Sequence, residues 1–342
     1  MKKVAVITTG GTIGSILNAD SVAVDMSSRR IAREIDVAKN KLGCSVVVDS
    51  PVNKNSEDFA PEDWGLILQS ILKACESDVD GIVVTHGTDT LIYSVAAALA
   101  YANLWNKKIC FTGAYYAPDH PASDTSLSLL SAIEFSLSPH PSSGVFVAFR
   151  SNAHNSEAHI LNGAALKPMP FDEVFFRAAY DHVVSEFSPK NGLSNDISLS
   201  SISIPYLGAK QLPSVDAITE ARKRVAYIHL HPGIDRQFLE AAVAQRDVLV
   251  VDMYHSGTGP AGSNSELIAF LQEQRGSVEV LMGAFPKENI DLPYESTASI
   301  KSAGAKVYGD LQGYYLYTFS VLGLASGIDV STVLERLQTF EV

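Results

Sequence analysis

The sequence predicts a two-domain α/β protein: a larger N-terminal domain with a mostly parallel sheet and helices on both faces, then a smaller C-terminal α/β domain. From the N-terminus, apolar β-branched runs alternate with helical patterns, which is typical of a parallel sheet covered by helices. Between residues 188 and 219, Ser, Asn, Gly and Pro accumulate and no helical period persists; a second alternating unit follows. We therefore expect an N-terminal domain at 1–190, a linker at 191–222 and a C-terminal domain at 223–342.

Short apolar runs predict the strands of both domains, and apolar residues spaced at the helical period predict the helices. One helix begins at Pro61, with the proline in its first turn and acidic residues behind it that complement the helix dipole. In the N-terminal domain we expect strands at 4–7, 44–48, 81–85, 108–111 and 144–149, and helices at 27–39, from 61, at 90–104 and at 126–137. In the C-terminal domain we expect strands at 225–230, 248–253 and 278–282, and helices at 236–245, 265–274 and 330–338.

Charge and composition argue against several classes of function. The net charge is −12, and an acidic surface repels phosphate backbones, so we expect no nucleic-acid partner. The three cysteines, Cys44, Cys75 and Cys110, lack the spacing of metal ligands, and a low, odd number suits a reducing compartment. The first apolar run is too short for a signal peptide, and no run reaches transmembrane length, so we expect a cytoplasmic protein without a membrane partner.

The first candidate catalytic group is the hydroxyl of Thr12. It follows the apolar run 4–7 and the pair Gly10-Gly11, which permits positive φ and lets a ligand approach the backbone closely. In open α/β sheets, ligands bind at the carboxyl ends of strands. A threonine hydroxyl is a poor nucleophile unless a neighbouring group takes its proton, so Thr12 needs a partner.

A second stretch, VVTHGTDT at 83–90, offers that partner. Here an apolar strand ends before Gly87, and Thr88 stands beside Asp89. The segments TTGGTIG at 8–14 and THGTDT at 85–90 resemble the two signature motifs of the bacterial-type L-asparaginases, at the ends of the first and third expected strands of this domain.

This resemblance implies a role for each residue. Thr12 would attack the side-chain amide carbon of the substrate and form an acyl-enzyme, and Thr88 would be the second essential threonine, hydrogen-bonded to a lysine. Asp89 would bind the α-amino group of the substrate. Backbone N–H groups near the two threonines would stabilise the oxyanion, with Gly11 and Gly87 among the substrate-binding residues.

A third segment resembles the substrate clamp of the same family. It reads NSEDF at 55–59 and PEDW at 61–64. The resemblance implies that Ser56 holds the α-carboxylate of the substrate and that Glu57 adds a second acid to its amino group. The alternative interpretation of these residues is a solvated acidic loop.

The relay lysine is assigned to Lys167. The family places this lysine in a short turn after the strand expected here at 144–149, but residues 151–162 contain no lysine. Lys167 stands nine residues before Phe176-Arg177, which resembles a Phe-Lys or Phe-Arg pair of the family. This assignment implies an enlarged loop before the lysine. A surface position of Lys167 would leave the chain without the relay.

Two further departures concern the surroundings of Thr12. Residues 15–43 contain no tyrosine, although many family members use one there to orient the nucleophile, and Tyr294 is expected to supply the phenol instead. The alternatives are a packed Tyr294 and an orienting role for Ser27 or Ser28. The loop YHSGTGP at 254–260 resembles the family pattern YGSGNxP, so Thr258 is expected in the substrate site where Asn is usual; in the family this loop borders the site of a neighbouring protomer.

Other patterns are weaker signals. Residues 257–262 match GxGxxG, but no clear acid ends the strand that follows, so we expect no dinucleotide site. His229 and His231 share the face of an expected strand, and His154 and His159 lie in a polar loop. We expect neither pair to bind a metal, and the resemblance implies no cofactor.

The sequence therefore predicts an amidohydrolase that uses a threonine nucleophile on a small amide, asparagine or a close relative, and belongs to asparagine metabolism. Family members assemble as tetramers of intimate dimers, so a homo-oligomer is expected, either a dimer or a homotetramer. Two other functions stay open. One is a dedicated amidase for another amide, and the other is a catalytically weak sensor that binds an amino acid.

Overall fold

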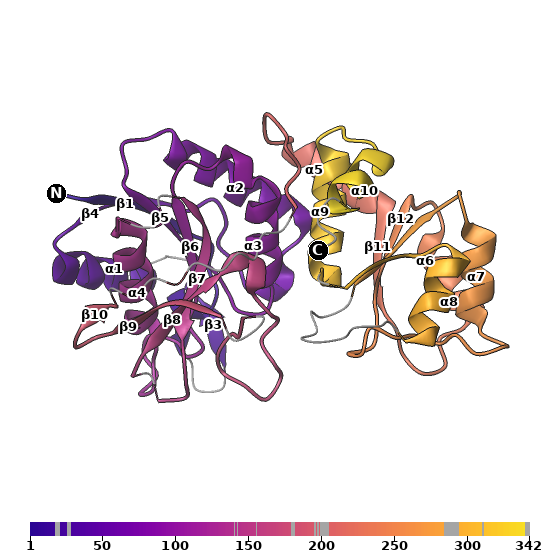
Figure 1. Cartoon of the computed structure of the whole chain (residues 1–342). Coiled ribbons are helices and arrows are strands. Elements are labelled where there is room, and N and C mark those ends of the chain that lie inside the picture. The colour runs from indigo at the N-terminus through magenta and orange to yellow at the C-terminus, as the bar shows by residue number, and fades with distance from the viewer. Residues whose placement is uncertain are drawn as a thin grey trace. The chain divides into compact units, whose positions relative to one another are not determined.

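The computed structural model describes residues 1–17, 21–25, 29–139, 141, 143–154, 156–178, 182–194, 196, 198, 205–283, 294–309 and 311–338. The chain divides into two compact units, Met1–Leu212 and Pro213–Val342 (Figure 1). This division lies inside the stretch 191–222, which also carries a short strand and a helix. Each unit is built on its own sheet.

The first unit contains an eight-stranded sheet in the order β10-β9-β8-β7-β6-β5-β1-β4. Its five strands from β7 to β4 run parallel, whereas β8, β9 and β10 pair antiparallel. The strands are β1 (Lys3–Thr8), β4 (Ser45–Asp49), β5 (Gly81–Thr85), β6 (Lys108–Thr112), β7 (Gly144–Arg150), β8 (Ala158–Asn162), β9 (Val183–Ser188) and β10 (Gly192–Leu193). The mostly parallel sheet is confirmed, and its antiparallel strands β8 to β10 are an addition to the expected elements.

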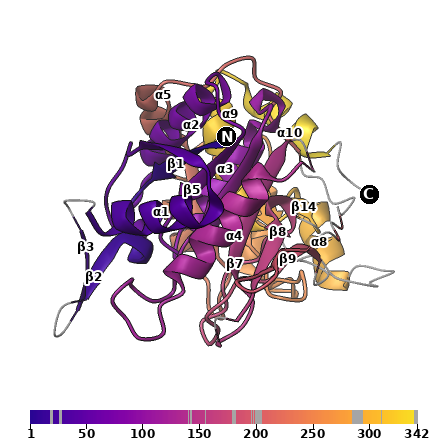
Figure 2. The same cartoon turned by 90° about the vertical axis from the view of Figure 1, so that its left-hand side faces the viewer.

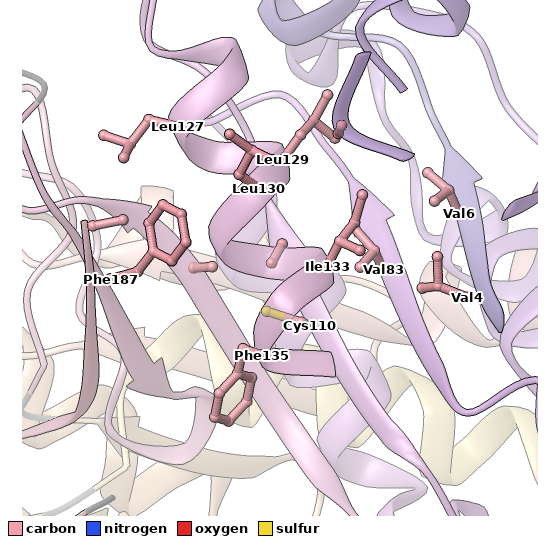
Figure 3. Packing of buried hydrophobic residues seen from close by; sticks show 14 of the residues in the cluster. Val4, Val6, Val83, Cys110, Leu127, Leu129, Leu130, Ile133, Phe135 and Phe187 are labelled. Carbon is pink, nitrogen blue, oxygen red and sulfur yellow. The ribbon is translucent and has the colours of Figure 1, made fainter. Parts of the chain in front are cut away.

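Four helices cover both faces of this sheet. They are α1 (Arg29–Leu42), α2 (Pro61–Cys75), α3 (Leu91–Ala100) and α4 (Thr125–Leu137). Alternate residues of a strand point to opposite faces. Val4 and Val6 of β1 join a core with residues of α1 and α4, including Ile133 (Figure 3). Ala5 and Ile7 are buried on the other face, where α2 contacts β1 and β5 and α3 contacts β7.

A short hairpin follows the first strand. It pairs β2 (Ser15–Leu17) with β3 (Val22–Val24) antiparallel, beyond the single-turn helix η1 (Thr12–Gly14). Figure 2 shows it projecting from the indigo part of the chain. The first two residues of the helix expected at 27–39 lie outside the described residues, and α1 continues to Leu42. The sequence did not predict the hairpin, because strands of three residues carry too little periodicity.

The second unit contains a parallel sheet in the order β11-β12-β13-β14. Its strands are β11 (Val225–His229), β12 (Val248–Asp252), β13 (Glu279–Gly283) and β14 (Lys306–Tyr308). Its helices are α5 (Val215–Ala221), α6 (Arg236–Val243), α7 (Glu266–Gln274), α8 (Glu295–Ala303), α9 (Gly313–Ala325) and α10 (Val330–Gln338). A core joins α6, α7 and α8 to one side of the sheet, while α9 packs on β11, β12 and β13 and also contacts α5 and α10.

Several helices differ from the expectations, among them α5, which was not predicted. The helix expected at 90–104 ends at Ala100 and is followed by the single-turn helix η3 (Ala102–Leu104), where Tyr101 is buried. Helix α9 was not predicted; it is apolar and buried on nearly all sides, so it lacks the polar face that marks an amphipathic helix. Among the helices of the described residues, none is both long and apolar enough to cross a bilayer.

Candidate functional site

The candidate site begins where β1 ends. Gly10 and Gly11 follow β1 with φ values of 92° and 77°, a left-handed conformation that favours glycine, and Thr12 opens η1. A Cβ atom on Gly11 would lie 2.5 Å from both the nitrogen and the Cα of Gly87. The two predicted motifs therefore touch through their glycines, which places Thr12 and Thr88 each next to the point of contact.

A third loop reaches the same point from the end of β4. A Cβ atom on Gly87 would lie 2.4 Å from Oγ of Ser56, which begins the single-turn helix η2 (Ser56–Asp58). The hydroxyl of Thr90 donates a hydrogen bond of 2.8 Å to the carbonyl oxygen of Ser56. The structure thus brings together the loops that carry Gly11, Ser56 and Gly87.

Exposure of the side chains differs by chemical type across these loops. Ser56 is buried, Thr12 and Thr88 are partly buried, and the carboxylates of Glu57 and Asp89 are exposed. Acids that are open to solvent are able to meet an ammonium group of an entering ligand, while the hydroxyls lie deeper. This distribution suits a small polar ligand that carries a positive charge.

His86 orients the second motif, a role that the sequence analysis did not assign to it. Its Nδ1 lies 2.8 Å from the carbonyl oxygen of Gly87, and its Nε2 lies 2.8 Å from Oγ of Ser94. A carbonyl only accepts hydrogen bonds, so the neutral ring carries its proton on Nδ1 and accepts from Ser94 at Nε2. Burial lowers the pKa of His86 to about 4, so the ring is neutral at pH 7.

This contact orients a backbone donor. In a trans peptide the C=O and the N–H point in opposite directions, so the bond from His86 to the carbonyl of Gly87 also sets the direction of the Thr88 N–H. The ring of Phe59 packs on His86 at a centroid distance of 4.6 Å. The sequence did offer a signal for this role, because His86 stands directly between the end of the expected strand and the glycine of the motif.

The chain after β6 forms another wall of the site. A Cβ atom on Gly113 would lie 2.6 Å from the carbonyl oxygen of His86 and 3.6 Å from Cγ2 of Thr88. It would also lie 3.6 Å from the ring of Phe149 on β7. Gly113 therefore stands directly behind Thr88, a neighbour that sequence spacing did not reveal.

Lys167 lies on the segment that follows β8 and the single-turn helix η4 (Gly163–Ala165). Its backbone N–H donates a hydrogen bond of 2.9 Å to the carbonyl oxygen of Arg177, and Lys167 is partly buried. The ring of the adjacent Phe176 packs edge-on against Phe149, with centroids 5.0 Å apart. The backbone near Lys167 is thus connected to Gly113 through two phenylalanine rings, while a pairing of its amine with Thr88 stays a prediction.

Tyr294 and Thr258 belong to the second unit. Tyr294 is the N-cap residue of α8 and is 55% exposed. The carbonyl oxygen of Thr258 accepts from the N–H of Tyr254, and the hydroxyl of Thr297 on α8 donates to the carbonyl oxygen of Gly257. The loop at 254–258 is therefore attached to α8. The predicted pairing of Tyr294 with Thr12 and the role of Thr258 stay predictions, and Ser27 and Ser28 lie outside the described residues.

Two histidines of the predicted pairs lie near acidic side chains. His229 ends β11 with its Nδ1 3.1 Å from Oδ2 of Asp252, whereas His231 lies beyond the strand. The Nε2 of His159 lies 3.9 Å from Oε1 of Glu186. Within the part of the chain that the structure describes, no group of three His, Cys, Asp or Glu side chains is arranged to hold a metal ion. The three cysteines are buried free thiols.

Comparison with known proteins identifies the part of the chain that holds these loops. Residues 3–164 match the family model described as Asparaginase, N-terminal. This part of the chain is an asparaginase-type domain. The predicted relationship is confirmed, and the match includes every proposed site residue of the first unit except Lys167, which lies just beyond its end.

Solved structures share the fold of the whole chain. The thermostable L-asparaginase from Thermococcus kodakarensis superimposes with a TM-score of 0.74 at 23% identity, covering 98% of this chain and 96% of that chain. L-asparaginase I from Vibrio cholerae superimposes with a TM-score of 0.74 at 20% identity, covering 100% and 97%. At these identities the likeness concerns the fold, and it confirms the two-domain α/β architecture predicted around the asparaginase-type domain.

Curated relatives carry another name, that of a component of glutamyl-tRNA(Gln) amidotransferase. The protein of this name from Methanococcus maripaludis strain C6 is 25% identical over 247 residues, 70% of this chain and 56% of that protein. Its namesake from Nanoarchaeum equitans is 25% identical over 350 residues, 97% of this chain and 81% of its own length. The chain thus spans little more than half of the Methanococcus relative.

Proposed function

We propose that this protein is an amidohydrolase that converts the side-chain amide of L-asparagine, or of a close relative, to the acid and ammonia. The observation that carries the proposal is the contact of three strand-end loops through Gly11, Ser56 and Gly87. Thr12 and Thr88 each follow one of these glycines, as in the motifs of an asparaginase-type domain. The convergence would place two threonine hydroxyls at one point on the carboxyl edge of a parallel sheet.

In the proposed reaction, Oγ1 of Thr12 attacks the amide carbon and its proton passes to a relay of Thr88 and Lys167. Backbone N–H groups beside Thr12 and Thr88 stabilise the oxyanion, and His86 holds the second of these donors in place. The relay protonates the amide nitrogen, ammonia leaves, and a threonyl ester remains. Water then hydrolyses the ester, which releases the acid and returns the proton to Thr12.

The substrate is proposed to bind by its charged ends. Ser56 holds the α-carboxylate, and the exposed carboxylates of Asp89 and Glu57 bind the α-ammonium group. An acid that meets the ammonium in both the ground state and the transition state affects KM more than kcat. This arrangement favours a free amino acid amide over a simple aliphatic amide.

A second candidate function rests on the curated relatives. Their name, that of a glutamyl-tRNA(Gln) amidotransferase component, points to transfer of an amide nitrogen. The substrate would then be an amide whose nitrogen passes to an acceptor, and glutamine competes with asparagine for the role. Ammonia release from asparagine, glutamine and simple aliphatic amides, with and without glutamyl-tRNA, separates these cases and also detects a dedicated amidase for another amide.

A sensor remains the rival from another class. An amino-acid-binding protein without turnover would be stabilised by ligand in proportion to RT ln(1 + [L]/Kd), about 2.7 kcal/mol at a hundredfold excess over Kd. Thermal unfolding with asparagine, combined with an ammonia assay on the same sample, distinguishes the two. Stabilisation without ammonia release would favour the sensor over the hydrolase.

The main experiment removes the proposed nucleophile. Thr12→Ala should lower kcat by on the order of 10³-fold or more while the thermal unfolding midpoint stays near that of the parent. Thr12→Ser keeps a hydroxyl and should retain much more activity, which makes it the matched control. An active Thr12→Ala protein would show that another group is the nucleophile.

A second experiment tests the relay in the same assay. Lys167→Met should lower kcat nearly as much as Thr88→Val does. The double variant should lose little more activity than either single variant, because the effects of residues in one relay are not additive.

A further inference from the structure

Arg150 is an arginine without solvent exposure at the carboxyl end of β7. Its side chain and that of Asp124, the N-cap residue of α4, both have 0% exposure, and their nearest atoms, Nη1 and Oδ2, lie 4.0 Å apart. Its Nε donates to the carbonyl oxygen of Asn152 at 2.9 Å. Within the described residues its two Nη atoms are buried without a hydrogen-bond partner. Removing a charged group from water without pairing its donors is costly, so the arrangement calls for a compensating role.

Asp124 shows where this pair acts. Its side chain does not cap α4; instead Oδ2 accepts from the N–H of Tyr115 at 3.0 Å and Oδ1 accepts from the N–H of Tyr116 at 2.9 Å. The guanidinium of Arg150 lies over the ring of Tyr116, with Cζ 5.6 Å from the centroid. The two charged side chains therefore hold one short stretch of backbone.

That stretch of backbone leads directly to the proposed site. Tyr115 is two residues after Gly113, which stands behind Thr88 and against the carbonyl oxygen of His86. The residue between them, Ala114, is buried, which leaves little freedom for the chain from β6 to Tyr116. A shift of the backbone at Tyr115 would thus be transmitted to the wall that Thr88 contacts.

We propose that Arg150 and Asp124 act as positioning residues that hold the backbone at 113–116 and thereby fix the place of Thr88. Burial raises the pKa of Asp124, while the two backbone N–H groups and the charge of Arg150 oppose that shift. The ionised carboxylate accepts from both N–H groups at once, which a neutral carboxylic acid does less well. A buried ion pair often contributes little net stability, and in some proteins it fixes a single packing instead, which is the role required here. This inference rests on the proposed function, in which Thr88 belongs to the proton relay.

The test compares three variants of the pair with a matched control. Arg150→Met removes the charge, Arg150→Lys keeps the charge but not the planar fork, and Asp124→Asn removes the carboxylate. Arg33→Met is the control, since Arg33 is an exposed arginine of α1 in the same unit. For each folded variant, kcat and KM for asparagine, the thermal unfolding midpoint, and the hydrogen exchange rates of the Tyr115 and Tyr116 amides are measured.

We expect Arg150→Met and Asp124→Asn to lower kcat by about 10- to 100-fold with KM changed by less than about threefold, the cost of a small misplacement. The double variant should be no worse than either single variant, and Arg150→Lys should recover part of the loss. The Tyr115 and Tyr116 amides should exchange faster in the Arg150→Met protein than in Arg33→Met.

Parent values of kcat and of amide exchange in a folded Arg150→Met protein would overturn the inference. If Arg150→Met does not fold, Arg150→Lys decides: parent kcat and exchange with only a lower unfolding midpoint would show a purely stabilising role. The exchange measurement needs no turnover. A parent protein that releases no ammonia from any amide refutes the proposed function, while faster exchange at Tyr115 and Tyr116 still reports whether the pair holds this backbone.

Discussion

At the scale of single residues, the site depends on glycines that have no room for a side chain. Gly11 needs glycine twice over, because its φ is 77° and its Cβ position is occupied by the backbone of Gly87. Gly87 must be glycine for reasons of space alone. A Cβ atom added to Gly87 would lie 2.7 Å from the Cβ atom of Ser56. Because these glycines have no side chain, the three loops can approach one another closely.

Gly87→Ala tests this contact. The new methyl group must displace Ser56 or Gly87, so we expect kcat/KM for asparagine to fall by about 10²-fold, since a displacement of about 1 Å in a site has a cost of this order. Gly262→Ala is the control, because a Cβ there meets nothing within 4 Å. Steady-state ammonia release measures both. Equal activity of the two variants would show that the loops do not need this close contact.

At the scale of elements, two lysine amines gather at the end of helix α4. Lys108 on β6 is buried, and its Nζ donates to the carbonyl oxygen and to Oγ of Ser138, directly after α4. The Nζ of Lys2 donates to the carbonyl oxygen of Leu137. Cations are favoured at the carboxyl end of a helix. Burial nevertheless lowers the pKa of Lys108 to about 8, because removal of its hydration opposes the charged form.

Lys108 therefore makes the free energy of unfolding depend on pH in the alkaline range. Between about pH 8 and the ordinary lysine pKa of 10.5, the unfolded chain binds more protons at this site than the folded chain, so the contribution of Lys108 to the free energy of unfolding rises with pH. Below about pH 8 both states are protonated and the contribution is constant. The free energy of unfolding, measured with denaturant from pH 7 to 10, should lose this rise with pH in the Lys108→Met variant. Lys73→Met, at an exposed lysine of α2, should keep it; identical slopes for all three proteins would contradict the lowered pKa.

At the scale of the whole molecule, the net charge is the feature that opposes nucleic-acid binding. The chain carries 38 acidic and 26 basic residues, a net charge of −12. The name of its curated relatives includes a tRNA, yet the chain spans only 56% of the Methanococcus protein. Recognition of RNA backbones needs clustered Lys and Arg, so the overall charge of this chain opposes it.

We expect no saturable binding of tRNA by this chain at physiological ionic strength. Fluorescence anisotropy of labelled tRNA measures this binding in a titration with protein up to tens of micromolar, repeated at about threefold lower salt. These conditions are chosen because non-specific complexes have dissociation constants of about 10⁻⁴–10⁻⁶ M and tighten as the salt concentration falls. Poly-Glu, which carries no base or ribose, serves as the competitor control. Saturable, salt-dependent binding that poly-Glu does not compete away would reveal a specific tRNA surface on this acidic chain.

The sequence by itself determined the local features. Apolar runs and helical periods predicted the parallel strands β1, β5, β6 and β7 and the helices α2 and α4 within a residue or two at the ends that were predicted, because burial on both faces leaves a strong local pattern. A glycine pair after β1 and a single glycine after β5 marked Thr12 and Thr88 as candidate site residues. The asparaginase-type domain was predicted from the same residues and is confirmed by the family match.

Only the tertiary structure decided how these segments meet. Contacts of Gly11 with Gly87, and of Gly113 with Thr88, join residues about 25 to 75 positions apart, and no local pattern encodes such a distance. The antiparallel strands β8 to β10 and the all-round apolar helix α9 were missed because their pairing and burial, rather than their periodicity, define them. The buried pair of Arg150 and Asp124 emerged only from packing, since a charged side chain gives no sign in the sequence that the fold removes it from water.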